Sequence, residues 1–321
     1  MATTSIATSH GLTLEQWNAR LYETYQEKTF FGKFKGTDEN AIIQVKRDLS
    51  KSRGDKVTFG LAGTLSGAGV TGNNPLSYSV GDGSAEGIGA GNEEAMVFYD
   101  QGVSIDQIRN GVRIAGAMDE QRVAFSLREQ AKMQLTDWMA RNEDAAIFTA
   151  IKTCDTVDIS ATHTAVTLDA IVDMKKEAMF PSGSTKKIRP IMLKGGEEVF
   201  VLGINPTDAA ALKKSDDFKQ IHLEASARGS ENPIFTGSLG VYNGVIIHEH
   251  SGFTAAQPVL MGAQAAFLAY ADEVLYGEEE FDYGNQTGFM IGSIRGVELA
   301  VFNDGVSNAG SHGAIQFDIT V

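Results

Sequence analysis

The chain has 321 residues, enough for one large domain or two ordinary ones. Its 41 acidic and 27 basic residues give a net charge of −14, which argues against general nucleic-acid binding because phosphate contacts need a basic surface. The lone Cys154 excludes an intramolecular disulfide and fits a reducing compartment. The polar residues 1–10 and the lack of a long apolar run predict neither a secretory signal nor a membrane partner.

The N-terminal part predicts a polar arm followed by a helix from Leu12 to Lys28. Thr13 suits the N-cap position of that helix. Four large side chains then recur at helical spacing on one face: Leu14, Trp17, Leu21 and Tyr25. Such a stripe is typical of a surface helix packed on its own core. The alternative is an arm that docks on a neighbouring subunit, and the two roles are compatible.

A glycine-rich excursion separates two predicted strands, Lys56 to Leu61 and Glu94 to Gln101. Residues Gly60 to Gly91 have almost no large apolar side chains, so this segment cannot bury enough surface to fold alone. We expect the two strands to pair into a long extension with a glycine-rich tip. Because an isolated hairpin is marginal in water, the extension needs support from another chain. An earlier strand is predicted from Ala41 to Leu49.

The stretch from Asp119 to Ile151 has no proline or glycine and predicts one long helix of about 50 Å. The side chains expected on its buried face are Ala124, Leu127, Ala131, Leu135, Trp138 and Ala145. Those expected on its solvent face are Arg122, Glu129, Lys132, Arg141 and Asp144. The apolar heptads do not persist, so the pattern favours a brace for a large flat body over a coiled coil.

The remaining elements mix helices and strands without regular alternation, which predicts an α+β fold. A strand over Gln107 to Ala115 leads into the long helix. Later helices are predicted from Thr167 to Phe180, after Asn205-Pro206, and from Asp216 to Ala225. Asn243-Gly244 between two apolar runs predicts a type I′ hairpin. The other expected strands are Ile188 to Leu193, Val199 to Ile204, Val259 to Tyr270, Gly288 to Ile294, Val297 to Phe302 and Ile315 to Val321.

The chemical motifs do not assemble into a catalytic, cofactor or metal site. Gly67 to Gly72 matches a dinucleotide fingerprint in letters but is followed by Asn-Asn-Pro and not by a helix. His248 and His250 share one face of a predicted strand, yet two ligands do not make a metal site, and half-exposed histidines are the expectation. The acidic run Glu278 to Glu280 with Asp282 predicts solvated charge, with a weak cation site at a subunit contact as the alternative. Cys154 is expected to be a small buried side chain rather than a nucleophile.

Several segments of the chain resemble the major capsid proteins of tailed bacteriophages, specifically the N4-like group. The main one runs from Asn232 to Glu249 (NPIFTGSLGVYNGVIIHE). Met118 to Arg122 (MDEQR), Val201 to Pro206 (VLGINP) and Phe281 to Asn285 (FDYGN) agree with it. The resemblance covers the chain from about Asp55 to the C-terminus, and its strength lies in the order and spacing of these segments.

The resemblance implies the fold of tailed-phage capsids, which encapsulins and the herpesvirus capsid floor share. In that fold a spine helix crosses a peripheral domain, an extended loop reaches over the adjacent subunit, and an axial domain points to the symmetry centre. The corresponding divisions here are an N-terminal arm and helix (1–54), the extended loop (55–101), the peripheral domain (102–154 and 272–321) and the axial domain (155–271).

The resemblance also implies assembly through hexamers and pentamers into an icosahedral head that encloses double-stranded DNA without sequence-specific binding. The expected location is the virion capsid, assembled in the host cytoplasm. Further copies of the chain are the expected partners, with scaffold, portal and decoration proteins as additional candidates. Some related capsids join subunits through a Lys–Asn bond from the extended loop, but no lysine lies between Lys56 and Lys132, so we predict no such cross-link. The alternatives are an encapsulin-like compartment shell and a soluble acidic enzyme of unknown type.

Overall fold

The computed structural model describes residues 29–47, 54–62, 96, 98–122, 126–181, 186–193, 195–215, 218, 238–302 and 310–319. The predicted helix from Leu12 to Lys28 lies outside these ranges. So do residues 63–91 of the glycine-rich segment and, apart from Phe218, the predicted helix from Asp216 to Ala225.

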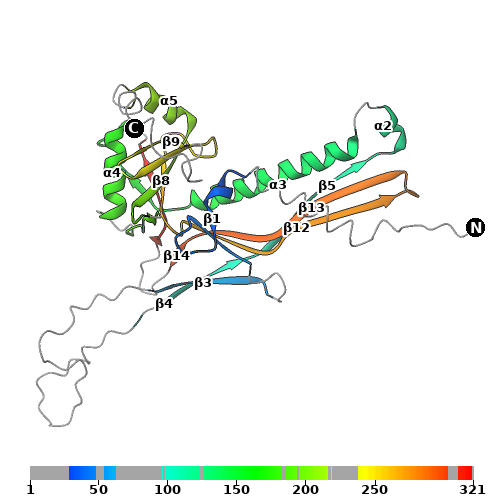
Figure 1. Cartoon of the computed structure of the whole chain (residues 1–321), viewed down its shortest axis with the longest axis horizontal. Coiled ribbons are helices and arrows are strands. Elements are labelled where there is room, and N and C mark those ends of the chain that lie inside the picture. Colours follow the sequence, from blue (N-terminus) through cyan, green and yellow to red (C-terminus); the bar gives the residue numbers. More distant parts are fainter. Residues whose placement is uncertain are drawn as a thin grey trace, which may run out of the picture.

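The described chain has two parts, a compact lobe and a long thin wing (Figure 1). The wing consists of α3 (Leu127–Ile151) laid along the strands β5 (Asp106–Ile114), β12 (Ala266–Phe281) and β13 (Gln286–Leu299). These strands belong to a sheet of order β1–β2–β12–β13–β5, in which β1 (Lys35–Gly36) and β2 (Ile43–Lys46) lie at the lobe end. The β12–β13 ladder is antiparallel and continues for most of both strands, so one hairpin forms the length of the wing.

The predicted long helix is two helices. The short α2 (Ala117–Arg122) lies at the wing tip, and α3 begins after Ser126. The Ser126 side chain accepts a hydrogen bond from the Glu129 N–H at 3.3 Å, which caps the new helix start. The 25 residues of α3 therefore span about 38 Å, shorter than the single helix that we expected.

The buried face of α3 agrees with the prediction only near its first half. Ala131 and Leu135 are buried, and Leu127 and Trp138 pack beside them against β5 and β13. Ala145, predicted to face inward, is exposed, and Lys132, predicted to face solvent, is buried. The reason is that one row of α3 side chains packs on the wing sheet and a different row, nearer its C-terminal end, packs in the lobe. The buried residues of α3 therefore do not lie on one straight face.

The lobe contains a sheet of order β6–β16–β11–β8–β10–β9, with β7 paired to β8. The strands are β6 (Thr156–Asp158), β7 (Ile191–Met192), β8 (Glu198–Ile204), β9 (Ser238–Tyr242), β10 (Val245–Glu249), β11 (Val259–Met261) and β16 (Ala314–Asp318). Two helices flank it, α4 (Leu168–Met179) and α5 (Pro206–Lys214). Alternate residues of the central strand β8 face opposite cores, so the sheet is covered on both sides.

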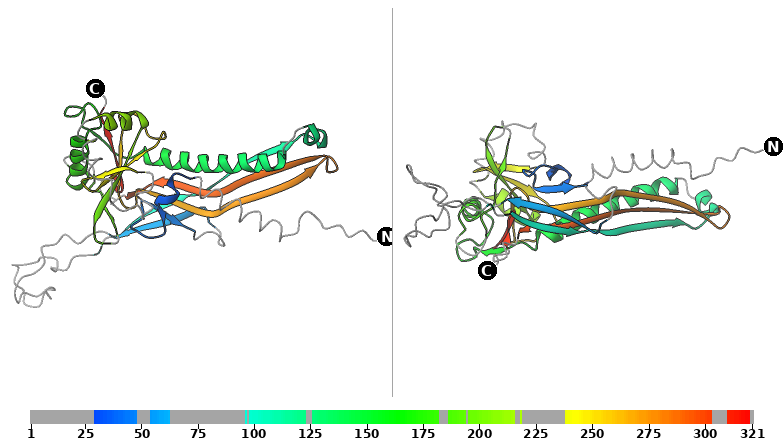
Figure 2. Two further views of the ribbon diagram at one scale, coloured as in Figure 1. Left: turned by 45° about the horizontal axis from the view of Figure 1, so that its top comes forward. Right: turned by 90° about the horizontal axis from the view of Figure 1, so that it is seen from below.

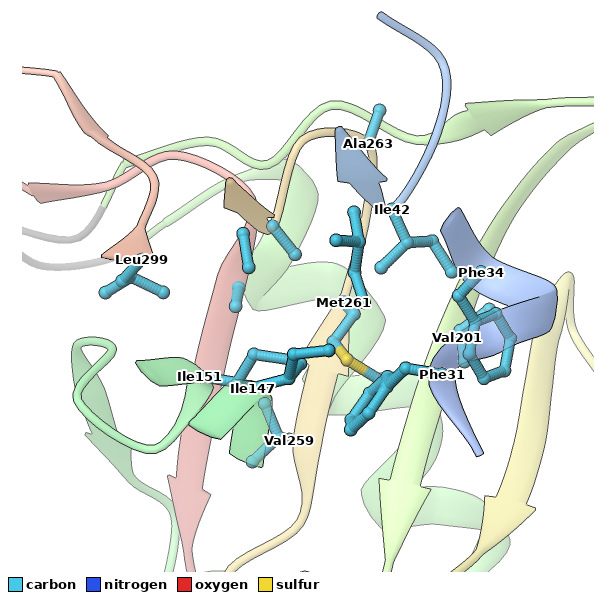
Figure 3. Close-up of a cluster of buried hydrophobic side chains, with 14 of the residues drawn as sticks. Phe31, Phe34, Ile42, Ile147, Ile151, Val201, Val259, Met261, Ala263 and Leu299 are labelled. Atoms are coloured by element: carbon cyan, nitrogen blue, oxygen red, sulfur yellow. The ribbon is translucent and has the colours of Figure 1, made fainter. Parts of the chain in front are cut away.

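One of these cores joins the lobe to the wing. Val201 and Met261 of the lobe sheet lie among the side chains of Phe31, Ile147 and Ile151 (Figure 3). Phe31 comes from η1 (Phe31–Phe34), and the two isoleucines come from the last turns of α3. The C-terminal end of α3 is therefore embedded in the lobe, while its N-terminal end supports the wing.

A second hairpin, β3 (Lys56–Ala62) with β4 (Phe98–Ser104), leaves the body on the side away from the wing tip (Figure 1). Phe59 stacks on Phe267 of β12 at 4.2 Å between ring centroids, which fixes the base of this hairpin. The small ladder of β14 (Val301–Phe302) and β15 (Gly310–Ser311) completes the described strands.

Several local predictions are confirmed. Thr167 caps α4, Asn205 caps α5 with Pro206 at its first turn, and β3 pairs with β4. Asn243 and Gly244 have φ values of 48° and 73°, as a type I′ turn requires.

The predicted strand boundaries were less accurate. Within the described residues, the strands predicted over Ala41 to Leu49, Ile188 to Leu193 and Glu94 to Gln101 correspond to β2, β7 and β4, while residues 48, 49, 94, 95 and 97 lie outside the described ranges. Val259 to Tyr270 is divided between β11 and β12, whereas the two strands predicted between Gly288 and Phe302 are mostly one, β13.

Candidate assembly surfaces and the junction that positions them

A buried charge cluster lies where the wing meets the lobe. Glu143 of α3 is fully buried, and its carboxylate accepts hydrogen bonds from the Tyr270 hydroxyl at 2.8 Å and from Arg295 at 3.2 Å. The Lys35 ammonium makes an ion pair with the same carboxylate. The cluster thus connects α3, β1, β12 and β13 through one side chain. Buried pairs of this kind are costly to break, because removal of one partner leaves the other charge uncompensated.

Desolvation dominates the electrostatics of this cluster. Burial raises the pKa of Glu143 to about 7, although Arg295 and the Tyr270 hydrogen bond oppose the shift. Burial likewise lowers the pKa of Lys35 to about 8, with Asp144 acting in the opposite direction. Neither Glu143 nor Lys35 was predicted from the sequence to be a site residue. A signal was present, however, because Glu143 interrupts the buried series Leu135, Met139, Ile147 and Ile151 at four-residue steps.

The neighbouring Asp144 holds the start of the described chain. Its carboxylate accepts hydrogen bonds from the backbone N–H groups of Phe30 at 2.8 Å and Phe31 at 3.4 Å. Burial raises the pKa of Asp144, and these two backbone hydrogen bonds oppose that rise. Asp144 was predicted to face solvent but is half-buried, because residues 29–36 cross over this part of α3.

The two histidines lie in an aromatic cluster and not in a metal site. His248 is only 1% exposed, so the prediction of a half-exposed side chain was wrong for this residue, whereas His250 is half-buried. The His250 ring stacks on Phe148 at 4.8 Å and lies 4.3 Å from Phe30. His248 meets Phe34 edge-on at 5.2 Å. Among the described residues, no three His, Cys, Asp or Glu side chains gather as a metal would require.

Cys154 and the acidic run occupy different environments. Cys154 is buried, and burial raises the pKa of its thiol to about 12, which makes it a poor nucleophile. Glu278 points toward α3 and pairs with Arg128 at 3.1 Å. Glu279 and Glu280 are exposed, as predicted for solvated charge.

Large apolar side chains are exposed at the extremities of the molecule. Met118 of α2 and Tyr283 of the β12–β13 turn mark the wing tip, and Met96 and Phe98 mark the outer end of the β3–β4 hairpin. The other exposed apolar side chains are Met133, Val172, Phe180, Met192 and Val241. Exposed apolar side chains that gather in one place are typical of surfaces that contact another protein, whereas single ones occur on any protein surface. No described helix has both the length and the apolar character needed to cross a membrane.

The comparison with known families decides which class of protein this is. The family of phage capsid proteins matches the chain over residues 5–172 and 152–258. The chain belongs to this family. Its role is therefore structural, and the surfaces described above are those of a capsid subunit rather than of an enzyme.

Relatives of the chain are similar over nearly its whole length. The major capsid protein of Pseudomonas phage KPP25 is 25% identical over 348 residues, covering 89% of both chains. The capsid of Ralstonia phage GP4 superimposes with a TM-score of 0.71 and 24% identity, covering 98% of this chain and 97% of the other. The capsid of cyanophage Pam1 gives a TM-score of 0.69 and 23% identity, with 92% and 93% covered. These structures confirm the expected capsid fold, and the narrower N4-like assignment stays a prediction.

Proposed function

We propose that this capsid protein is the principal shell subunit of a phage head and assembles through hexamers and pentamers around double-stranded DNA. The observation that carries this proposal is the family match over residues 5–258, together with an elongated body whose apolar side chains are exposed at its two ends. Several weak contacts made at once by different projections raise the effective concentration of each, so a shell can close without any single large interface.

We assign the wing to the peripheral domain and the lobe to the axial domain of this architecture. The β3–β4 hairpin and the glycine-rich segment beyond it are the extended loop (55–101) that crosses the adjacent subunit. In support, α3 runs along the whole wing as a spine would, and β3–β4 leaves the body away from the wing tip. The proposed boundaries do not follow the sheets everywhere: β16 lies in the lobe sheet although it falls within 272–321, and β12 lies in the wing sheet although it begins at Ala266, within 155–271.

The charge of the chain suits a container for DNA. With a net charge of −14, the subunit repels phosphates on average, so a shell of many copies does not trap DNA that is pumped into it. We therefore propose enclosure without specific DNA recognition. Scaffold, portal and decoration proteins are further candidate partners, and the host cytoplasm is the proposed place of assembly.

Expression of the full chain followed by electron microscopy tests this function. We expect closed icosahedral particles with hexameric and pentameric units, either from the chain alone or with the products of neighbouring genes. Particles from infected cells should contain double-stranded DNA. Particles that instead contain an enzyme would support the compartment-shell alternative. A subunit that stays monomeric under all these conditions would overturn the proposal.

A further inference from the structure

The outer half of the wing has a hollow of about 470 Å³ on its sheet. Three of the strand residues that line it are glycines, Gly111, Gly277 and Gly288, which bring no side chain of their own. The Phe281 ring lies over Gly288 and the end of the Met290 side chain over Gly277, since an added Cβ would stand 3.0 Å and 3.3 Å from them. Phe281 and Met290 supply apolar walls. The Arg113 guanidinium lies 3.6 Å from the centre of the Phe281 ring, so a fixed cation borders the same hollow.

The strand register places this hollow on the face of the sheet away from α3. Phe289 pairs with Val112 and Glu278, and this row packs on α3, as the contact of Glu278 with Arg128 shows. The adjacent rows, Gly111–Met290–Gly277 and Arg113–Gly288–Glu279, must therefore point to the other face.

Within the described residues, this second face is covered only near the lobe. At Gly296 the β4 strand lies so close that an added Cβ would stand 2.0 Å from the Ser104 carbonyl oxygen. From that point β3–β4 runs away from the wing tip (Figure 2). The described hairpin of the same chain therefore does not reach the hollow.

The outer end of the β3–β4 hairpin has the matching chemistry. Phe98 is 68% exposed and Met96 is 73% exposed, although both are large apolar side chains. Asp100 lies two residues from Phe98, so it stands on the same exposed face of the strand. The next residues inward, Tyr99 and Leu61, pack instead on the buried cluster at the base of the hairpin.

We propose that Phe98 of one copy inserts into the glycine-lined hollow of the next copy. This inference rests on the proposed function and names the contact through which subunits join. Asp100 then faces Arg113 and the exposed Arg109 of the neighbour. Glu279 of the neighbour lies on the same face and is acidic. Because the inserting end and the receiving hollow project in opposite directions from one body, the contact is head-to-tail. A head-to-tail contact closes into a ring when its rotation permits, as hexamers and pentamers require.

Photo-crosslinking tests the contact directly. Phe98 is replaced by p-benzoyl-L-phenylalanine, which keeps the aromatic ring, and ¹⁴N- and ¹⁵N-labelled subunits are co-assembled before irradiation. We expect crosslinks between differently labelled subunits that map to residues 277–290. Closed particles whose crosslinks fall elsewhere, within one subunit, or on a separate surface protein would overturn the inference and leave the proposed function intact. Failure of the unmodified chain to form particles would count against the proposed function itself.

Two variants and one control test the fit. Gly277→Leu should fill the hollow, because a Cβ at this position meets only the flexible end of Met290 at 3.3 Å. Phe98→Ser removes the inserting ring. We expect each variant to reduce the yield of closed shells at least about tenfold while the free subunit keeps its circular dichroism spectrum. Met133→Ser removes an exposed apolar side chain from α3, on the other side of the wing, and should assemble normally. Normal assembly of both variants, or an equal loss in the control, would contradict the contact.

Discussion

The Tyr270 hydroxyl donates a hydrogen bond of 2.8 Å to the Glu143 carboxylate and thereby joins β12 to the buried side of α3. Lys35 and Arg295 contact the same carboxylate from β1 and β13. One acidic side chain is therefore the common partner of three strands of the same sheet. Since α3 continues from the wing into the lobe, this cluster fixes the direction in which the wing leaves the lobe.

Glu143→Ala should lower the free energy of unfolding of the unassembled subunit by about 3–5 kcal/mol, because Lys35 and Arg295 would remain buried without their anion. Asp137→Ala is the matched control, since this acidic residue lies on the same helix but is half-exposed and pairs with the exposed Arg141. It should cost about 0.5 kcal/mol or less. Equilibrium denaturation, followed by the fluorescence of Trp138 on α3, measures both. Equal losses in the two variants would contradict a special role for the buried cluster.

Protonation of His250 should destabilise the subunit in mild acid, whereas the raised pKa of Glu143 acts in the opposite direction. Burial lowers the pKa of this imidazole, Asp144 opposes the shift, and Lys33 adds to it. Its Nδ1 atom accepts a hydrogen bond from the Gly252 N–H at 3.0 Å, which also requires the neutral ring. The unfolded chain therefore binds the proton more readily than the folded one, and stability is lost as pH falls through the folded pKa.

His250→Phe keeps the stacking on Phe148 and removes the titration. We expect the melting temperature of the unmodified subunit to fall between pH 7 and pH 5 relative to that of the variant. Identical pH profiles would show that His250 does not contribute to the acid sensitivity.

The particle should contain no covalent link from the extended loop. The absence of lysine between Lys56 and Lys132 removes the amine that a Lys–Asn bond would need there. Mature particles boiled in denaturant should therefore run as monomers on a gel. A ladder of covalent multimers that resists reduction would refute this prediction.

Gly244→Ala should destabilise the lobe by about 1–2 kcal/mol, because φ at this position is 73° and the new methyl group would disfavour it. An added Cβ would also lie 3.2 Å from the Glu198 carbonyl oxygen. Gly60→Ala is the control, since no atom lies within 4 Å of a Cβ there. Thermal unfolding of the two free subunits compares them, and a control as damaging as Gly244→Ala would count against the turn as the cause.

Local signals in the sequence predicted the local structure well. Thr167, Asn205 and the Asn243-Gly244 pair each act within a few residues, through a cap or a turn, so their outcome needs no knowledge of the rest of the fold. The capping residue Ser126 followed by Glu129 is a signal of the same kind that was overlooked, and it separates α2 from α3.

The long-range features were harder to predict for a physical reason. Lys132 is buried beside Phe289, and His248 lies among Phe34 and Lys33, yet these partners are far apart in the sequence. A single helical stripe could not describe α3, since its partner changes from the wing sheet to the lobe core along its length. The hollow of the wing sheet was also invisible, because it depends on the register that aligns glycines from three strands.

As far as the structure describes the chain, the outer half of the wing is one helix and one sheet thick, and this has a mechanical consequence. The helix and the strands both run along the wing, so they resist stretching and bending in that direction. The sheet is twisted and uncovered on one face, so it yields more readily to torsion. In the proposed shell, subunits in rings of different size would therefore share one lobe structure and differ by a slight rotation of the wing. The curvature of the finished particle would then be distributed over many small elastic adjustments rather than taken up at a single hinge.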